Sequence, residues 1–295
     1  MDRRNGTGGD TDPTLAAIAA WPAVEPWVDR VREATTALRW HSALRRRIPE
    51  AAAESRVWGA QASAELDGAR SDVAHVRDLL CGGLATNGER DTARPPDPVE
   101  ATVRAAARVT AETEYVRPML RRSPAQALAR LHVAAASQLV ADEAVGRPRR
   151  AGETCGEFAD LGPAPDPTMV VARLSGVYAV LADTSAPAFV AAALAHAEIV
   201  HVRPFVRGNG LVARALERAL LVESGLDPTG VCVPEGGHLE VGATAYLGSL
   251  VAYAGGTRAG LELWLEHCGR AWCEAAALGA SIADAVRAGK LDPNR

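Results

Sequence analysis

Apolar residues recur at helical spacing through most of the chain. In the first clear run, Val28, Val31, Ala34 and Leu38 follow one another at intervals of three and four, which is the period of an amphipathic helix. Such patterns predict helices at about 26–47, 49–66, 73–80, 98–120, 123–145, 168–183, 187–200, 211–221, 239–254 and 257–288. The chain is therefore expected to be all-α.

Three segments interrupt the helical pattern. The first, 87–98, reads NGERDTARPPDP and fits a linker or an exposed loop. The second, 146–167, is polar and rich in Pro and Gly, and the third, 226–238, has little periodicity. The first 13 residues have the composition of a disordered tail.

Composition and charge narrow the class of protein. Hydrophobic residues make up 48% of the 295 positions, enough for a substantial core, whereas aromatic residues make up only 4%. Packing must therefore rest on Ala, Leu and Val, which suit close helix contacts. The net charge of −4 gives no general attraction to nucleic acid or to anionic lipid, so neither is an expected partner.

Cysteine usage and hydropathy bear on location. The five cysteines are odd in number and form no CxxC pair, so neither a disulfide framework nor a structural zinc site is indicated. We find no convincing secretory signal. No apolar run reaches the ~18 residues that would span a bilayer. The prediction is a cytoplasmic protein without a membrane partner.

The segment 203–214, RPFVRGNGLVAR, carries the clearest candidate chemistry. Gly208, Asn209 and Gly210 tolerate positive φ, so successive backbone N–H groups can converge on one anion. The helix predicted to follow adds the dipole that favours negative charge at its N-terminus. A GNG tripeptide alone also fits an ordinary turn, so the flanking residues carry the argument.

Those flanks resemble a known signature. From Ala195 the chain reads AHAEIVHVRPFVRGNGLVARALERALL. This stretch resembles the Fic (Fido) family, whose signature is His, Pro-Phe, any residue, Asp or Glu, Gly-Asn-Gly-Arg, two residues and Arg. The family also repeats a His and two apolar residues upstream, at the positions of His196, Ile199 and Val202. Without gaps, the matching signature positions are Pro204, Phe205, Gly208, Asn209, Gly210 and Arg214.

Three signature positions differ. The resemblance implies a His that takes a proton from a target hydroxyl, an acidic residue that holds Mg²⁺ and two Arg residues that clamp phosphate. In this chain the His position is Arg203, the acidic position is Arg207 and the first Arg position is Leu211. A guanidinium has a pKa above about 12 and no acceptor atom, so it cannot act as a base near neutral pH. Mg²⁺ prefers oxygen ligands, so binding of Mg²⁺ in the family's manner is not expected. The residues predicted to bind phosphate or nucleotide are Arg203, Arg207, Gly208, Asn209, Gly210 and Arg214.

A second motif lies upstream. Ser63, Asp67 and Gly68 fit the family's inhibitory pattern of Ser or Thr, three residues, Glu, then Gly or Asn, with Asp in place of Glu. The resemblance implies that this carboxylate pairs with the second signature Arg, here Arg214. Ser63 and Asp67 are four residues apart and share one helix face. The alternative is the last turn of a surface helix with a Gly cap.

The histidines do not supply an obvious base or metal site. His201 lies two residues from the family's catalytic position and is at most a remote substitute base. His196 stands in an apolar run and is expected to be a core residue bonded to backbone. His75, His132 and His238 offer no paired spacing for a metal, so no metal site is predicted.

The resemblance implies a fold and a domain organisation. We expect a Fido-type helical bundle with an N-terminal helical extension: a tail at 1–13, an N-terminal helical region with the inhibitory-like helix at 14–97, a Fido-like core at 98–288 and a tail at 289–295. In the family, the segment that corresponds to 146–167 forms a flap that docks the target as an added strand.

Three functions remain open. The preferred hypothesis is a catalytically impaired relative of protein AMP-transferases whose GNG turn binds ATP, another nucleotide or a phosphate. The first alternative is an active nucleotidyl- or phosphoryl-transferase with non-standard, metal-independent chemistry, in which Arg203 and Arg207 neutralise the phosphates. The second alternative is a non-catalytic scaffold for an unidentified protein partner.

Overall fold

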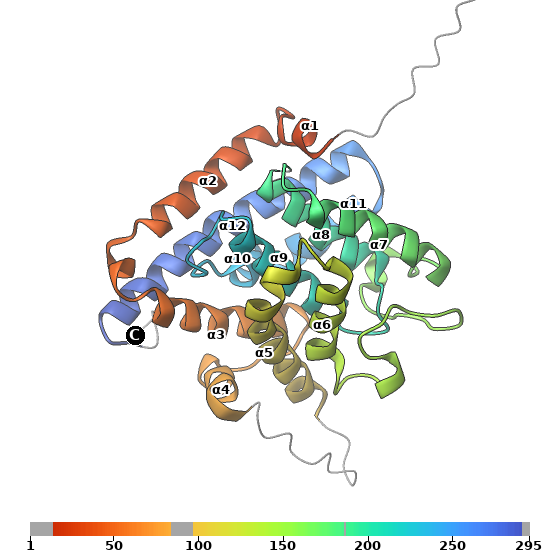
Figure 1. Ribbon diagram of the computed structural model, residues 1–295, viewed down its shortest axis with the longest axis horizontal. Helices are drawn as coiled ribbons and strands as arrows, with labels where there is room; N and C mark the ends of the chain where they lie inside the picture. Colours follow the sequence, from red (N-terminus) through yellow and green to blue (C-terminus); the bar gives the residue numbers. More distant parts are fainter. Residues whose placement is uncertain (1–13, 84–96, 186, 291–295) are drawn as a thin grey trace, which may run out of the picture.

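The computed structural model describes residues 14–83, 97–185 and 187–290. Within these residues the chain is all-α and forms no strand (Figure 1). The predicted tail at 1–13, most of the Pro-rich break and the last five residues of the predicted C-terminal tail lie outside the described residues. The helices are α1 (Leu15–Ala19), α2 (Glu25–Arg39), α3 (Ile48–Leu66), α4 (Val73–Asp78), α5 (Pro98–Val116), α6 (Pro124–Ala136), α7 (Pro167–Ala182), α8 (Ala188–Val202), α9 (Asn209–Glu223), α10 (Pro234–Val241), α11 (Ala243–Ala254) and α12 (Arg258–Arg287).

Side-chain caps fix several helix starts. Asp97 and Asp166 each accept a hydrogen bond from a backbone N–H of the first turn, in α5 and α7 respectively. Both caps precede a proline, whose missing N–H would have no partner at that position. Helices α5 and α7 therefore each begin at a capped N-terminus.

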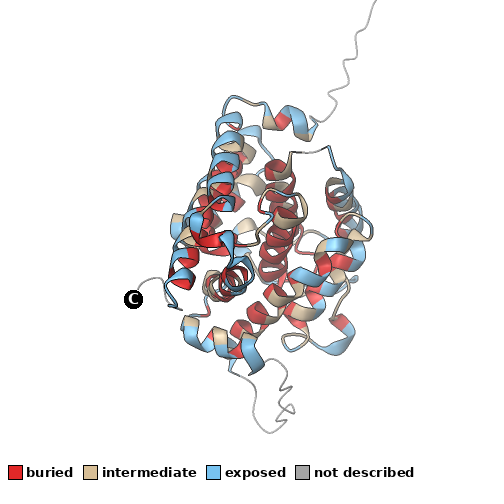
Figure 2. Ribbon diagram, turned by 60° about the vertical axis from the view of Figure 1, so that its left-hand side comes forward, coloured by how far each residue is buried: buried red, intermediate tan, exposed pale blue. Residues whose placement is uncertain are grey.

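Helix α9 forms the centre of the bundle. Every residue from Asn209 to Leu221 is buried, and buried residues line the interior helices in Figure 2. Three of them are charged and each is paired: Arg214 with α3, Glu217 with α8 and α10, and Arg218 with α10. A helix buried on all sides can carry charge only with such partners. The signature turn therefore opens the most enclosed helix of the protein.

The N-terminal helices share the main hydrophobic core. Val31 of α2 and Val57 of α3 belong to the same buried cluster as Val103, Leu216 and Trp272. Helix α2 lies along α12, as Figure 1 shows. The predicted boundary between 14–97 and 98–288 does not separate two hydrophobic cores, and the division itself stays a prediction.

Several element bounds differ from the sequence prediction. Helix α1 precedes the first predicted helix, and α6 ends at Ala136 rather than near 145. Segment 226–238 was expected to be irregular, but α10 begins within it, with Pro234 in the first turn. Gly242, with φ +116°, then separates α10 from α11. Two successive glycines hid the helical pattern of α10, because Gly is a poor helix former.

One of these glycines is required by packing. A Cβ at Gly237 would lie 1.9 Å from the backbone carbonyl oxygen of Ala271 in α12. Gly237→Ala should therefore lower the free energy of unfolding by about 1–3 kcal/mol or more, because the two helices must separate. Gly248→Ala in α11, where nothing lies within 4 Å of the added Cβ, is the matched control. Urea denaturation should show no loss of stability, or a gain of up to about 1 kcal/mol, for this control. Equal losses for the two variants would contradict the packing argument.

None of the described helices combines the length and the hydropathy that a membrane crossing requires.

Candidate functional site

Arg203 ends α8 and holds the segment that corresponds to the family's flap. Its backbone is left-handed, with φ +46°, and its side chain is buried. Nη1 donates to the carbonyl oxygens of Glu157, Phe158 and Gly162, and Nη2 donates to that of Pro163, at 2.9–3.2 Å. The guanidinium thus binds backbone of segment 157–163. Contact with a phosphate would require these hydrogen bonds to break.

The GNG turn holds a carboxylate of the protein itself. Gly208 N–H donates to Glu157 Oε1 at 2.7 Å. The backbone N–H and the side-chain Nδ2 of Asn209 donate to Glu157 Oε2 at 2.9 and 2.7 Å. Gly208 reaches this geometry with φ +90° at the start of α9. The turn therefore places three N–H donors around one anionic group, as expected for an anion-binding turn at a helix N-terminus.

The surroundings of Glu157 act on its pKa in opposite directions. Burial and the neighbouring Asp67 carboxylate raise the pKa of Glu157, while the N–H donors of Gly208 and Asn209 act in the opposite direction. The Glu157 carboxyl group is therefore held in the turn by these donors although burial and Asp67 disfavour its charged form. A competing anion would remove Glu157 from this unfavourable neighbourhood.

Arg214 is bound by the upstream helix α3. Its Nη2 donates to Asp67 Oδ1 at 2.7 Å and to the Ser63 carbonyl oxygen at 3.0 Å, while Nε donates to Ser63 Oγ at 2.8 Å. Tyr246 Oη lies 3.5 Å from Nη1. The ion pair anticipated between Asp67 and Arg214 is therefore formed. Whether it is inhibitory stays a prediction.

The residues at the end of α3 form a Gly cap and also place Asp67 next to Arg214. Gly68 has φ +83° and donates to the Glu65 carbonyl, while Ala69 N–H donates to the Ala64 carbonyl. This double hydrogen bond is a Schellman C-cap. The Gly cap ends the helix at Asp67, and it thereby places the Asp67 carboxylate beside Arg214.

Gly210 makes room where these groups meet. A Cβ at this position would lie 2.9 Å from both Asp67 Oδ1 and the Phe158 ring. Leu211, which replaces the first signature Arg, is buried. The second and third members of the GNG turn thus serve different needs: Asn209 binds Glu157, and Gly210 allows the close approach of α3 and segment 157–163.

A cavity of about 530 Å³ lies beside the turn, within the size range of small-molecule sites. Its charged lining consists of the carboxylates of Asp67, Glu157 and Asp160 and one guanidinium, that of Arg207. The Arg207 side chain is exposed and forms no hydrogen bond or ion pair within the described part of the chain. The full lining is Leu66, Asp67, Thr102, Leu139, Glu157, Phe158, Asp160, Arg207, Gly208, Leu211, Ala243, Thr244, Tyr246 and Leu247.

Two histidines near the signature loop do not line the cavity. His201 packs against Tyr253, with ring centroids 6.3 Å apart, and does not line the cavity. His132 is stacked on Phe205, accepts a hydrogen bond from Gly146 N–H and contacts the Arg207 carbonyl. Burial lowers the pKa of His132 to about 4, so it is neutral and donates from Nε2. His132 therefore fixes the start of segment 146–167 to the signature loop.

His196 is a core residue, but its partners are side chains. The expectation of backbone bonding is wrong: Nδ1 contacts Glu217 Oε2 and Nε2 contacts Tyr246 Oη, each at 2.7 Å. His238 contacts the same Glu217 carboxylate. Sequence spacing did not reveal this cluster, because three helices contribute one residue each. The signal that the sequence offers for this cluster is that His196, Glu217 and His238 are polar residues in largely apolar surroundings.

Comparison with known proteins identifies the region that contains the signature loop. Residues 126–221 match the family model of the Fic/DOC family, and this range contains the signature loop and nearly all of α9. The chain contains a Fic domain. No curated protein matches the chain.

Solved structures share the Fic-domain fold. A Fic family protein from Desulfovibrio desulfuricans G20 has a TM-score of 0.65 at 20% identity, covering 87% of this chain and 74% of that protein. Fic-1 (residues 134–508) from C. elegans has a TM-score of 0.65 at 17% identity, covering 90% and 73%. A Fic domain containing signaling protein from Bacteroides thetaiotaomicron VPI-5482 has a TM-score of 0.60 at 14% identity, covering 90% and 98%. These likenesses establish the helical fold.

Proposed function

We propose that this Fic-domain protein binds a nucleotide, with ATP as the first candidate, by placing a phosphate in the GNG turn in competition with its own Glu157. The observation that carries the proposal is the carboxylate held by the N–H groups of Gly208 and Asn209. A phosphate oxygen presents the same kind of acceptor as a carboxylate oxygen. The adjoining cavity has room for the rest of a nucleotide.

The site is closed in this conformation. Glu157 fills the turn, and Asp67 pairs with Arg214. The three lining carboxylates outnumber the single guanidinium of Arg207, so the cavity repels a polyphosphate until Glu157 leaves. Because Arg203 binds the carbonyls on both sides of Phe158, displacement of Glu157 is linked to movement of segment 157–163.

Nucleotide transfer by the family's route is not expected. Arg203 occupies the position of the proton-accepting His, and a guanidinium does not accept protons near neutral pH. Arg207 stands where an acidic residue would hold Mg²⁺, and a cation is no metal ligand. We therefore propose a binding protein in preference to an AMP-transferase. The proposed setting is the cytoplasm, without a nucleic-acid or membrane partner.

Two assays on the unmodified chain test this proposal together. Calorimetry with ATP, ADP and inorganic phosphate, with and without Mg²⁺, should show saturable nucleotide binding that does not require the metal. Incubation with α-labelled ATP should leave the protein and added lysate proteins unlabelled. Label incorporation by the purified protein would instead favour an active transferase.

The scaffold alternative makes a separate prediction. If the Fic fold serves only as an interaction surface, calorimetry will detect no nucleotide, even with the Glu157→Gln variant. That outcome would contradict the proposed function.

A further inference from the structure

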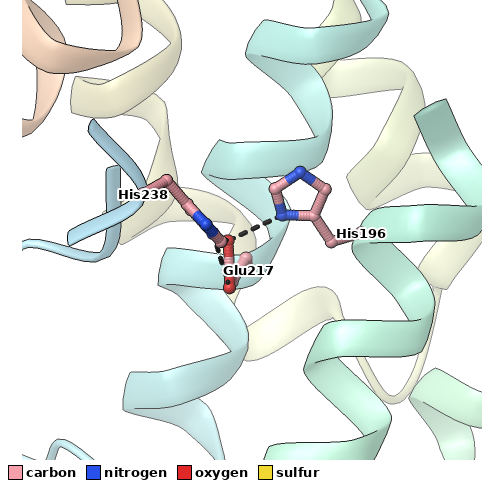
Figure 3. A group of neighbouring side chains, drawn as sticks. All are labelled: His196, Glu217 and His238. Carbon is pink, nitrogen blue, oxygen red and sulfur yellow. Dashed lines mark hydrogen bonds and ion pairs between the residues drawn. The ribbon is translucent and has the colours of Figure 1, made fainter. Parts of the chain in front are cut away.

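Three buried side chains from three helices meet outside the cavity. His196 comes from α8, Glu217 from α9 and His238 from α10, and all are at most 1% exposed. Figure 3 shows them directed toward one another. His196 Nδ1 and His238 Nε2 lie 2.7 and 2.9 Å from Glu217 Oε2, and the three ligand atoms lie within 4.8 Å of one another.

We propose that His196, Glu217 and His238 bind a divalent transition-metal ion of the zinc class. Two imidazoles and one carboxylate suit Zn²⁺, Co²⁺, Ni²⁺ or Fe²⁺ better than Mg²⁺ or Ca²⁺, which prefer oxygen ligands only. Metal–ligand distances of about 2.0–2.1 Å in tetrahedral geometry separate ligand atoms by roughly 3.3 Å. To reach that separation, the two N–O distances would lengthen by about half an ångström, and the two imidazole nitrogens, which lie within 4.8 Å of each other, would take up the same spacing.

Each ligand also has a partner on its far side. His196 Nε2 contacts Tyr246 Oη at 2.7 Å, and His238 Nδ1 contacts His267 Nε2 at 3.0 Å. Glu217 Oε1 accepts a hydrogen bond from Trp272 Nε1 at 2.5 Å. Metal-binding histidines and carboxylates are commonly oriented in this way by outer hydrogen bonds. When both imidazoles turn a lone pair toward a metal, Tyr246 and His267 are placed to accept the protons of the opposite ring nitrogens.

The charge of the cluster favours a cation. The Glu217 carboxylate is buried between the two imidazoles of His196 and His238. The nearby guanidinium of Arg214 contacts Tyr246 and is paired with Asp67. A carboxylate in a protein core is stabilised by a neighbouring cation, and a divalent ion at the three ligand atoms would supply one.

Elemental analysis of the full-length protein tests the proposal. Protein stripped with a chelator and dialysed against micromolar Zn²⁺ should retain about one metal ion per chain, and Co²⁺ should give the visible absorption of a tetrahedral site. Glu217→Gln should lose this metal. His75→Gln is the matched control, because His75 forms a similar His–carboxylate contact with Glu100 on the surface but has no second imidazole; this variant should retain the metal.

Two further measurements test the proposal even if Glu217→Gln fails to fold. Tyr246→Phe removes only the outer hydroxyl and should weaken Zn²⁺ affinity about 10- to 100-fold in a chelator competition. Crystals of the unmodified protein grown with Zn²⁺ should give an anomalous peak between the three ligand atoms. Unmodified protein without retained metal, or a peak elsewhere such as at His75, would overturn the proposal and leave the cluster as a hydrogen-bonded part of the core.

Discussion

Glu157→Gln is expected to tighten ATP binding by about 10- to 100-fold, because it replaces an ionised competitor in the GNG turn with a neutral amide. The carboxylate accepts three hydrogen bonds there, and a hydrogen bond to a charged group contributes about 1.5–3 kcal/mol. Losing one such contribution corresponds to roughly a tenfold to hundredfold change in affinity. Calorimetric titration of the variant and of the unmodified protein under one salt condition measures the difference.

Asp160→Asn provides the control for charge alone. Asp160 lines the same cavity but forms no hydrogen bond to the turn within the described residues, so its removal should change ATP affinity by less than about threefold at physiological salt. An equal gain in the two variants would mean that general repulsion, rather than occupation of the turn, limits binding.

The pH dependence of anion binding supplies a second readout of the same contact. Docked Glu157 has a pKa above its ordinary value of 4.5, whereas displaced Glu157 returns to that value. Displacement therefore releases a proton between the two pKa values, so affinity for sulfate, whose charge is constant over this range, should rise with pH across that window. Glu157→Gln should abolish the slope, and a slope retained in this variant would assign it to another group.

The largest loss of stability is expected from Glu235→Gln, at about 3–5 kcal/mol in the free energy of unfolding. Glu235 accepts two hydrogen bonds from Arg218, from Nε at 2.8 Å and from Nη2 at 2.7 Å, and both residues are buried. The variant leaves a buried guanidinium without its counter-charge. Urea denaturation of the variant and of the unmodified protein measures the loss.

An ion pair on the surface serves as the comparison for the buried pair of Arg218 and Glu235. Arg258 and Glu262 form an ion pair at 2.8 Å on the surface of α12, so Glu262→Gln should change stability by no more than about 0.5 kcal/mol. A loss of similar size in both variants would contradict the role assigned to burial.

Local sequence pattern predicted most of the fold. Helical periodicity located α3, α5, α7, α8, α9 and α12 to within a few residues at most ends, because each has a periodic apolar face or a proline near its first turn. It failed at α10, where Gly236 and Gly237 are present for a close contact with α12 rather than for helix propensity. That requirement arises from tertiary packing and leaves no local trace.

The candidate site was predictable only in part. The residues of the GNG turn predicted an anion-binding turn, and the resemblance to the Fic family implied the contact between Asp67 and Arg214. Glu157 was not identified, because it lies in an aperiodic segment, 51 residues before Gly208. Arg203 was expected at a phosphate, yet the left-handed end of α8 turns its guanidinium to the carbonyls of segment 157–163. Long-range contacts of this kind require the three-dimensional fold.

The backbone amide resonances of Gly208 and Asn209 test the central claim most directly. In an NMR titration of the unmodified protein with ATP, both should shift saturably with the midpoint found by calorimetry, and at lower ATP concentration in Glu157→Gln. Amides that stay unchanged while ATP binds, or shifts confined to other parts of the chain, would contradict the account of the GNG turn as the phosphate site.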